Sequence, residues 1–129
     1  MILVDSSVWI DYFNGKPTKQ SNLLDLLLTR EDILVGDLIL VEVLQGFKHE
    51  KDFNAAKKLF NDLINVDLGG NMVAQLSLSN YRILRQKGVT VRKTIDIIIG
   101  SYCIYNEIPL LHSDKDFDAM VKHCRLKVL

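Results

Sequence analysis

The chain has 129 residues, a length that suits one domain burying roughly two-thirds of its unfolded surface. Its 48% hydrophobic and 25% charged residues are typical of a well-packed globular protein, and the formal net charge of zero argues against broad attraction to polyanions. Asp5 follows the short apolar start at once, and no apolar run approaches membrane-spanning length. We therefore expect one domain over 1–129, without a signal peptide or membrane partner, in the cytoplasm.

The hydrophobic pattern predicts short buried strands that alternate with helices. We expect strands at 1–5, 33–36, 65–68, 108–111 and 126–129. We expect helices at 8–13, 22–29, 38–46, 53–64, 72–87, 95–105 and 116–122, with a charged turn at 48–52. Ser6 or Ser7, Asp37 and Thr94 are the expected N-caps of the first, third and sixth helices. Strands separated by helices predict an α/β fold with a parallel sheet.

Four carboxylates stand at informative places in this pattern. Asp5 ends the first strand, Asp114 follows a later strand, and Glu42 and Asp96 lie within apolar helical runs. Buried acids are costly without a cationic partner, and no Lys or Arg lies three or four residues from Asp5 or Glu42. Ligands of open parallel sheets gather outside the carboxyl ends of the strands, where Asp5 and Asp114 lie. Together the four acids predict a pocket for a divalent metal.

Three of the four acids also have a purely structural explanation. Asp5 could cap the helix that follows it, Asp96 could compensate the dipole at a helix start, and Glu42 could make a tertiary salt bridge. Without a metal, structural reasons would have to account for all four acids at once, which favours the metal.

The segment around Asp114 contains two further polar residues. Ser113 and Asp116 have the S-x-x-[DE] spacing of a capping box, with Ser113 as the cap and Asp116 reaching back. That role for Asp116 leaves Asp114 as the metal ligand. Oxygen ligands without His or Cys select Mg²⁺ or Mn²⁺, and such sites carry out phosphoryl chemistry.

Four segments, taken in order, resemble PIN-domain ribonucleases, and within them the VapC toxins of toxin–antitoxin pairs. They are ILVDSSVWID at 2–11, VEVLQG at 41–46, TID at 94–96 and LLHSDKDF at 110–117. The resemblance implies a PIN-like three-layer α/β/α sandwich around a mostly parallel sheet of four to five strands. It also implies an endoribonuclease that uses Mg²⁺ or Mn²⁺ and leaves 3′-hydroxyl and 5′-phosphate ends.

The resemblance assigns roles to individual residues. The catalytic, metal-binding acids of the family fall on Asp5, Glu42, Asp96 and Asp114, and Asp116 matches a further acid near the site. Ser7 matches a small polar residue that orients the first Asp. His112 stands where these toxins often have Thr, so this chain has an imidazole that can change charge near neutral pH where the family has a hydroxyl.

Partners follow from the same resemblance and from one basic cluster. A basic cluster brackets Gly88 just ahead of Asp96 and contains Arg82, Arg85, Lys87, Arg92 and Lys93. Within it, the residues expected to contact RNA phosphates are Arg82, Arg85, Arg92 and Lys93, the alternative being a solvated surface. The resemblance implies a homodimer and a small VapB-like antitoxin whose tail fills the acidic groove.

Two other interpretations keep the parallel sheet but change the function. A receiver-type signalling domain also binds Mg²⁺ with acids at strand ends, but its paired acids after the first strand and its phosphoacceptor Asp are missing. A PIN-like scaffold that binds without cleaving is the second alternative, and an activity assay distinguishes it.

Overall fold

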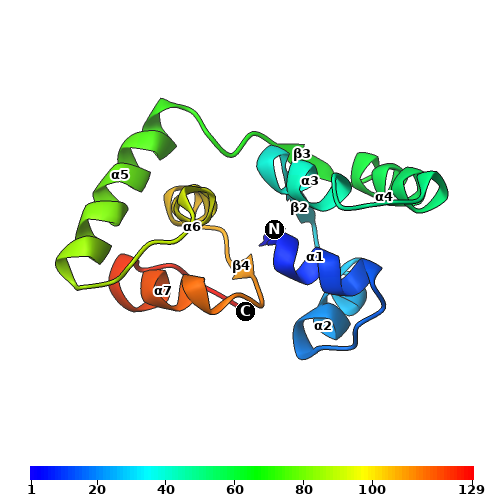
Figure 1. Cartoon of the computed structure of the whole chain (residues 1–129), viewed down its shortest axis with the longest axis horizontal. Coiled ribbons are helices and arrows are strands. Elements are labelled where there is room, and N and C mark those ends of the chain that lie inside the picture. Colours follow the sequence, from blue (N-terminus) through cyan, green and yellow to red (C-terminus); the bar gives the residue numbers. More distant parts are fainter.

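Four short strands form one parallel sheet in the order β3-β2-β1-β4. In the computed structural model, which describes residues 1–129, these are β1 (Ile2–Val4), β2 (Ile33–Gly36), β3 (Ile64–Val66) and β4 (Leu110–Leu111). The first four helices are α1 (Ser6–Phe13), α2 (Lys19–Leu27), α3 (Asp37–Leu44) and α4 (Glu50–Asn61). The others are α5 (Asn71–Gln86), α6 (Thr94–Asn106), the 3₁₀ turn η1 (Lys115–Phe117) and α7 (Asp118–Cys124) (Figure 1).

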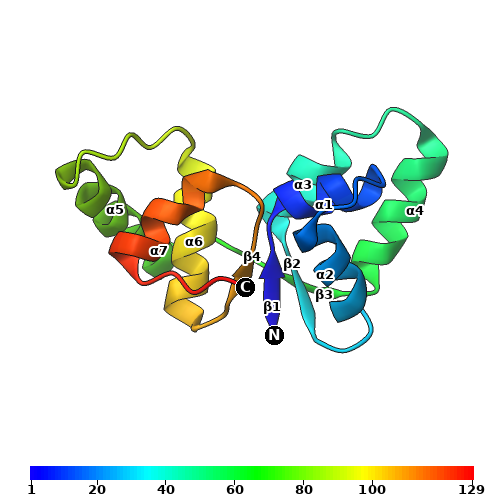
Figure 2. The same cartoon turned by 90° about the horizontal axis from the view of Figure 1, so that it is seen from below.

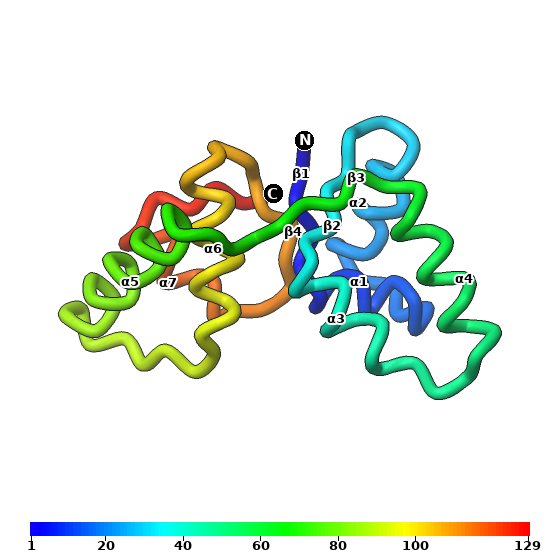
Figure 3. Tube along the Cα trace, turned by 90° about the horizontal axis from the view of Figure 1, so that it is seen from above, coloured from blue at the N-terminus to red at the C-terminus, as the bar shows by residue number.

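The helices cover both faces of this sheet. Helices α1 to α4 lie on one face and α5 to α7 on the other, which gives three layers (Figure 2). The segment between β3 and α5 carries the chain from one helical layer to the other (Figure 3). The predicted three-layer α/β/α sandwich with a parallel sheet is thus confirmed, with four strands.

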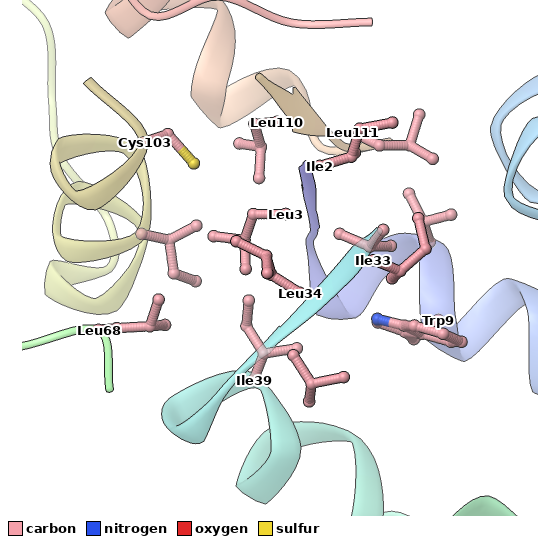
Figure 4. Close-up of a cluster of buried hydrophobic side chains, with 14 of the residues drawn as sticks. Ile2, Leu3, Trp9, Ile33, Leu34, Ile39, Leu68, Cys103, Leu110 and Leu111 are labelled. Atoms are coloured by element: carbon pink, nitrogen blue, oxygen red, sulfur yellow. The ribbon is translucent and has the colours of Figure 1, made fainter. Parts of the chain in front are cut away.

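The register of the sheet explains how the core is filled. Leu3 pairs with Leu34 on one side and Leu110 on the other, so these three side chains form a row that faces α6 (Figure 4). The alternate residues turn toward the opposite layer, where Trp9 is fully buried and its ring centroid lies 4.8 Å from that of Phe60. Trp9 therefore belongs to the hydrophobic core.

Several predicted boundaries were wrong for local reasons. The expected strand at 126–129 is a single bridge between Leu110 and Val128. Helix α4 begins at Glu50 inside the expected charged turn, because acids in a first turn are favoured by the helix dipole. Helix α2 begins at Lys19 because Thr18 and Ser21 form a capping box. None of the helices is long and apolar enough to span a membrane.

Candidate metal centre

The carboxyl ends of β1 and β4 and the start of α6 meet at one edge of the sheet (Figure 2). Asp5 lies at this edge, directly after β1, and is 3% exposed. It is the N-cap of α1, since its Oδ2 accepts a 3.0 Å hydrogen bond from the backbone N–H of Ser7. The expected cap at Ser6 or Ser7 was therefore wrong. The Oδ1 atom of Asp5 is buried without a hydrogen-bond partner, so capping leaves one oxygen free.

Asp114 is positioned in the same way after β4. Its Oδ1 accepts a 2.9 Å hydrogen bond from the backbone N–H of Asp116, which makes Asp114 the cap of η1. The predicted capping box from Ser113 to Asp116 was wrong. The backbone N–H of Ser113 instead donates to Ser7 Oγ at 3.1 Å, so the Ser7 hydroxyl joins the first turn of α1 to the segment that follows β4.

Asp96 lies in the first turn of α6 and is 8% exposed. The predicted N-cap of this helix at Thr94 was wrong, because the cap position is Lys93 and has no side-chain cap. The Oδ2 atom of Asp96 is buried and makes no hydrogen bond. Each of Asp96, Asp114 and Asp116 offers one carboxylate oxygen to a group whose members lie within 4.8 Å of one another. This group is where the structure brings the predicted ligands closest together.

The pKa of Asp96 depends on burial and on the charges around this group. Burial is the main reason that the pKa of Asp96 rises from 3.8 to about 6, while Lys93 opposes the rise. The negative charges of Asp5, Asp114 and Glu42 raise the pKa of Asp96 further. Asp5 and Glu42 lie outside the 4.8 Å group, yet they are close enough for their charges to act on it. The four predicted acids thus share one electrostatic site.

Glu42 approaches the site from α3 and is half-buried. Its Oε1 accepts a 3.0 Å hydrogen bond from Ser6 Oγ, in the first turn of α1. No Lys or Arg pairs with Glu42, so the tertiary salt bridge considered for it does not form. Sequence reasoning missed Ser6 as a partner of Glu42, and its position next to Asp5 was the only signal in the sequence.

Two cations of the segment between α5 and α6 reach the acids. Lys93 Nζ lies 3.6 Å from Asp96 Oδ2 and 3.5 Å from Asp114 Oδ2. Arg92 Nη2 lies 2.6 Å from Asp116 Oδ1, and this hydrogen bond is the main reason that the pKa of Asp116 is lowered. The acids are therefore partly neutralised from within the chain, which the sequence interpretation had not considered for Asp96.

The remaining predicted residues lie outside the close group of acids. Arg82 and Arg85 are exposed on α5, and Arg85 Nη1 donates to the carbonyl of Val89 at 3.3 Å. His112 is half-buried against Phe117, with ring centroids 5.0 Å apart. Its Nδ1 accepts a 3.2 Å hydrogen bond from the backbone N–H of Asp114. His112 therefore supports the turn that presents Asp114.

The donor set fits a hard divalent cation. Every member of the close group is a carboxylate, and two buried carboxylate oxygens of the site, Asp5 Oδ1 and Asp96 Oδ2, have no hydrogen-bond partner. Oxygen ligands without thiolate or imidazole suit Mg²⁺, Ca²⁺ or Mn²⁺ and not zinc or copper. A groove beside the cluster, with a cavity of about 300 Å³, is lined by Arg92, Lys93 and Asp116 among others.

Comparison with known proteins identifies the family of this chain. The family model "PIN domain" matches residues 2–122. Ribonuclease VapC11 of Mycobacterium tuberculosis is 27% identical over 129 residues, covering 98% of this chain and 96% of the relative. The crystal structure of VapBC2 from Rickettsia felis bound to a promoter DNA fragment has a TM-score of 0.76 at 19% identity and covers 100% of this chain and 98% of that chain. The M. tuberculosis VapC20 structure, a sarcin-ricin loop cleaving toxin, has a TM-score of 0.63 at 15% identity, covering 92% of this chain and 94% of that chain. Because the family model matches nearly the whole chain, this protein belongs to the PIN domain family.

Proposed function

We propose that this protein is a metal-dependent endoribonuclease and the toxin of a toxin–antitoxin pair. The observation that carries the proposal is the convergence of Asp96, Asp114 and Asp116 beside the partnerless buried oxygen of Asp5. The relative from M. tuberculosis is named a ribonuclease, and it aligns over almost the whole of both chains. Family membership leaves the receiver-domain alternative without support.

In this proposal Asp5, Glu42, Asp96 and Asp114 hold Mg²⁺ or Mn²⁺, with Asp116 as a further ligand. When bound, the cation lets water attack a phosphodiester at neutral pH and offsets the charge that builds on the phosphate. The chain itself fixes the carboxylates in place. Backbone N–H groups hold one oxygen each of Asp5 and Asp114. The second oxygen of Asp5 has no hydrogen-bond partner, and the second oxygen of Asp114 lies 3.5 Å from the ammonium of Lys93.

Three polar residues support this arrangement. The Ser7 hydroxyl, in the first turn of α1, accepts a hydrogen bond from the backbone N–H of Ser113, which keeps the two acid-bearing strand ends together. His112 accepts a hydrogen bond from the backbone N–H of Asp114 and so orders the same turn. We assign Ser7, His112 and Ser113 to positioning and not to chemistry.

The RNA chain is proposed to follow the cations that lead to the acidic cluster. Arg82 and Arg85 make no ion pair and are exposed, so their charges are free to meet phosphates. Arg92 and Lys93 lie closer to the cluster, where their own carboxylate contacts reduce the net charge offered to RNA.

The partner proposal rests on the relatives. The structures similar to this chain include toxin–antitoxin complexes named VapBC, one of them bound to promoter DNA. We propose a VapB-like antitoxin for this chain, and we add the homodimer and the cytoplasmic location that the resemblance to VapC toxins implies.

The decisive experiment is cleavage of structured RNA by the purified protein with Mg²⁺ or Mn²⁺. Ribosomal RNA is a suitable first substrate because one structural relative is a sarcin-ricin loop cleaving toxin. We expect cleavage with metal, none with excess chelator, and none with Asp96→Asn or Asp114→Asn. Asp62→Asn is the matched control. Asp62 is exposed at the end of α4, and α4 lies on the face of the sheet opposite α6, which carries Asp96.

Two results would contradict the proposal. If Asp96→Asn cleaved RNA at the wild-type rate, Asp96 would not be a metal ligand required for catalysis. Mn²⁺ binding without cleavage of any RNA in a cellular pool would favour the non-cleaving scaffold.

A further inference from the structure

We propose that Lys93 is a built-in counter-ion of the acidic cluster, which the catalytic metal must displace and which therefore weakens the protein's affinity for that metal. The inference rests on the proposed function, because it assumes that Asp96 and Asp114 are metal ligands. It identifies a residue of this chain that determines the metal concentration needed to fill the site.

The position of the ammonium group carries the inference. Lys93 Nζ lies 3.6 Å from Asp96 Oδ2 and 3.5 Å from Asp114 Oδ2, and so bridges two acids that come from different elements. The oxygen that it approaches on Asp96 is one of the two buried carboxylate oxygens of the site that make no hydrogen bond. The ammonium thus lies beside the atoms that a divalent cation would use.

The two cations cannot both stay there. A divalent ion held by Asp96 and Asp114 would bring two positive charges within a few ångströms of the Lys93 ammonium, and this repulsion is strong in a partly buried site. Lys93 is able to leave, because its side chain is 51% exposed and consists of a flexible four-carbon stem. The side chain can therefore turn into solvent or toward a phosphate when metal enters.

The neighbouring cation behaves differently. Arg92 makes a 2.6 Å contact with Asp116 Oδ1 alone, and its side chain is 61% exposed. A guanidinium in such a pair neutralises one carboxylate without lying between two of them. Lys93 is thus the cation in this segment that contacts two of the carboxylates proposed to hold the metal.

A counter-ion of this kind has two effects on the protein. Without metal it relieves repulsion between the carboxylates, because an opposite charge within a few ångströms favours the ionised forms. With metal it must be displaced, and the lost ion pairs reduce the free energy gained on metal binding. Removing the charge at position 93 should therefore tighten metal binding.

The test is isothermal titration of the full-length protein with Mn²⁺, comparing wild type, Lys93→Gln, Lys93→Arg and Lys87→Gln. We expect Lys93→Gln to bind Mn²⁺ about fivefold more tightly, as suits partly exposed ion pairs. Lys93→Arg keeps the charge and should bind within about twofold of wild type. Lys87→Gln removes a charge from an exposed residue at the end of α5 that makes no ion pair, and it should also match wild type.

Thermal melting provides a second measurement of the same comparison. Mn²⁺ should raise the melting temperature of Lys93→Gln by more than it raises that of wild type, since a tighter ligand stabilises the native state more. Equal or weaker Mn²⁺ affinity of Lys93→Gln, or an equal or smaller rise in melting temperature, would overturn the counter-ion role. Wild-type protein that binds no Mn²⁺ would overturn the proposed function itself, so the two failures are distinguishable.

Discussion

Ser6 Oγ donates a 3.0 Å hydrogen bond to Glu42 Oε1 and so joins the first turn of α1 to α3. Ser6 is 8% exposed and follows Asp5 directly, so the same turn of backbone positions both Asp5 and Glu42. Because no cation pairs with Glu42, this hydroxyl is its fixed partner inside the chain. The contact makes Ser6 a positioning residue for the acidic site.

Ser6→Ala should weaken Mn²⁺ binding and leave the fold intact. Loss of one hydrogen bond to a partly buried carboxylate should cost about 1 kcal/mol of unfolding free energy, and the freed Glu42 should lower Mn²⁺ affinity about fivefold. Denaturant unfolding and titration calorimetry measure the two effects. Ser79→Ala is the control, because Ser79 is exposed on α5. Mn²⁺ affinity equal to wild type in Ser6→Ala would show that Glu42 needs no such anchor.

The sequence predicted those features of the site that depend on strand ends. Asp5 and Asp114 each follow a strand, and parallel topology brings such residues to one edge of a sheet whatever the details of packing. The apolar runs around Glu42 and Asp96 likewise indicated helices that pack on that sheet. These patterns depend on the period of the hydrophobic residues, which survives errors of a few residues in each boundary.

The caps and the countercharges could not be predicted in the same way. Ser113 and Asp114 both suit an N-cap, and the choice between them depended on a hydrogen bond from Ser113 to Ser7, 106 residues away in the sequence. Lys93 and Asp114 are 21 residues apart, and their contact depends on how the segment before α6 returns to the sheet. Such tertiary contacts leave no local signal in the sequence.

The exposed pair Arg82 and Arg85 gives a prediction on RNA binding. Changing both to Ala should weaken binding and reduce the slope of log affinity against log salt by about 1.4, if each contacts one phosphate of a single strand. Mn²⁺ affinity should not change, because neither residue contacts the acids. Filter binding at several salt concentrations, with a cleavage-defective background, measures the slope.

The control for this pair is Lys57→Ala with Lys58→Ala. Both lysines lie on α4, which covers the opposite face of the sheet from α5 (Figure 2). We expect their replacement to leave the salt slope close to wild type. A wild-type slope in the arginine variant would instead mean that Arg82 and Arg85 form an ordinary solvated surface.

A buried polar contact between α5 and α6 gives a prediction on stability. Asn80 Nδ2 donates a 3.0 Å hydrogen bond to Ser101 Oγ, and these residues are 4% and 0% exposed. Asn80→Ala should lower the unfolding free energy by about 2 kcal/mol, because it removes the bond and leaves the Ser101 hydroxyl with one partner fewer. Denaturant unfolding measures this loss, with the exposed neighbour Gln75→Ala as control. A cost below that of the control would mean that Ser101 finds another partner.

The raised pKa of Asp96 predicts how metal-free stability changes with pH. The pKa of Asp96 is about 6 in the folded protein and 3.8 for an ordinary Asp. Between these two pH values the native state keeps the Asp96 proton, whereas the unfolded chain has lost it. The stability contributed by protonated Asp96 is complete below about pH 3.8 and is lost as pH rises through about 6. At pH 7.5 the ionised, buried carboxylate of Asp96 therefore lowers the free energy of unfolding by up to about 3 kcal/mol. The neutral amide of Asp96→Asn avoids this loss.

Metal-free Asp96→Asn should accordingly melt several degrees above wild type at pH 7.5, and this difference should shrink toward pH 4. Mn²⁺ should raise the melting temperature of wild type, since it binds the native state, and should raise that of the variant much less. Asp118→Asn is the control, because this exposed acid in the first turn of α7 lies outside the close group of carboxylates, and its replacement should leave the Mn²⁺ response intact. If Asp96→Asn melted below wild type at pH 7.5 and kept the full Mn²⁺ response, Asp96 would be a structural acid at a helix start. Stability and metal binding moving in opposite directions is the result expected of a carboxylate that is buried to serve a cation.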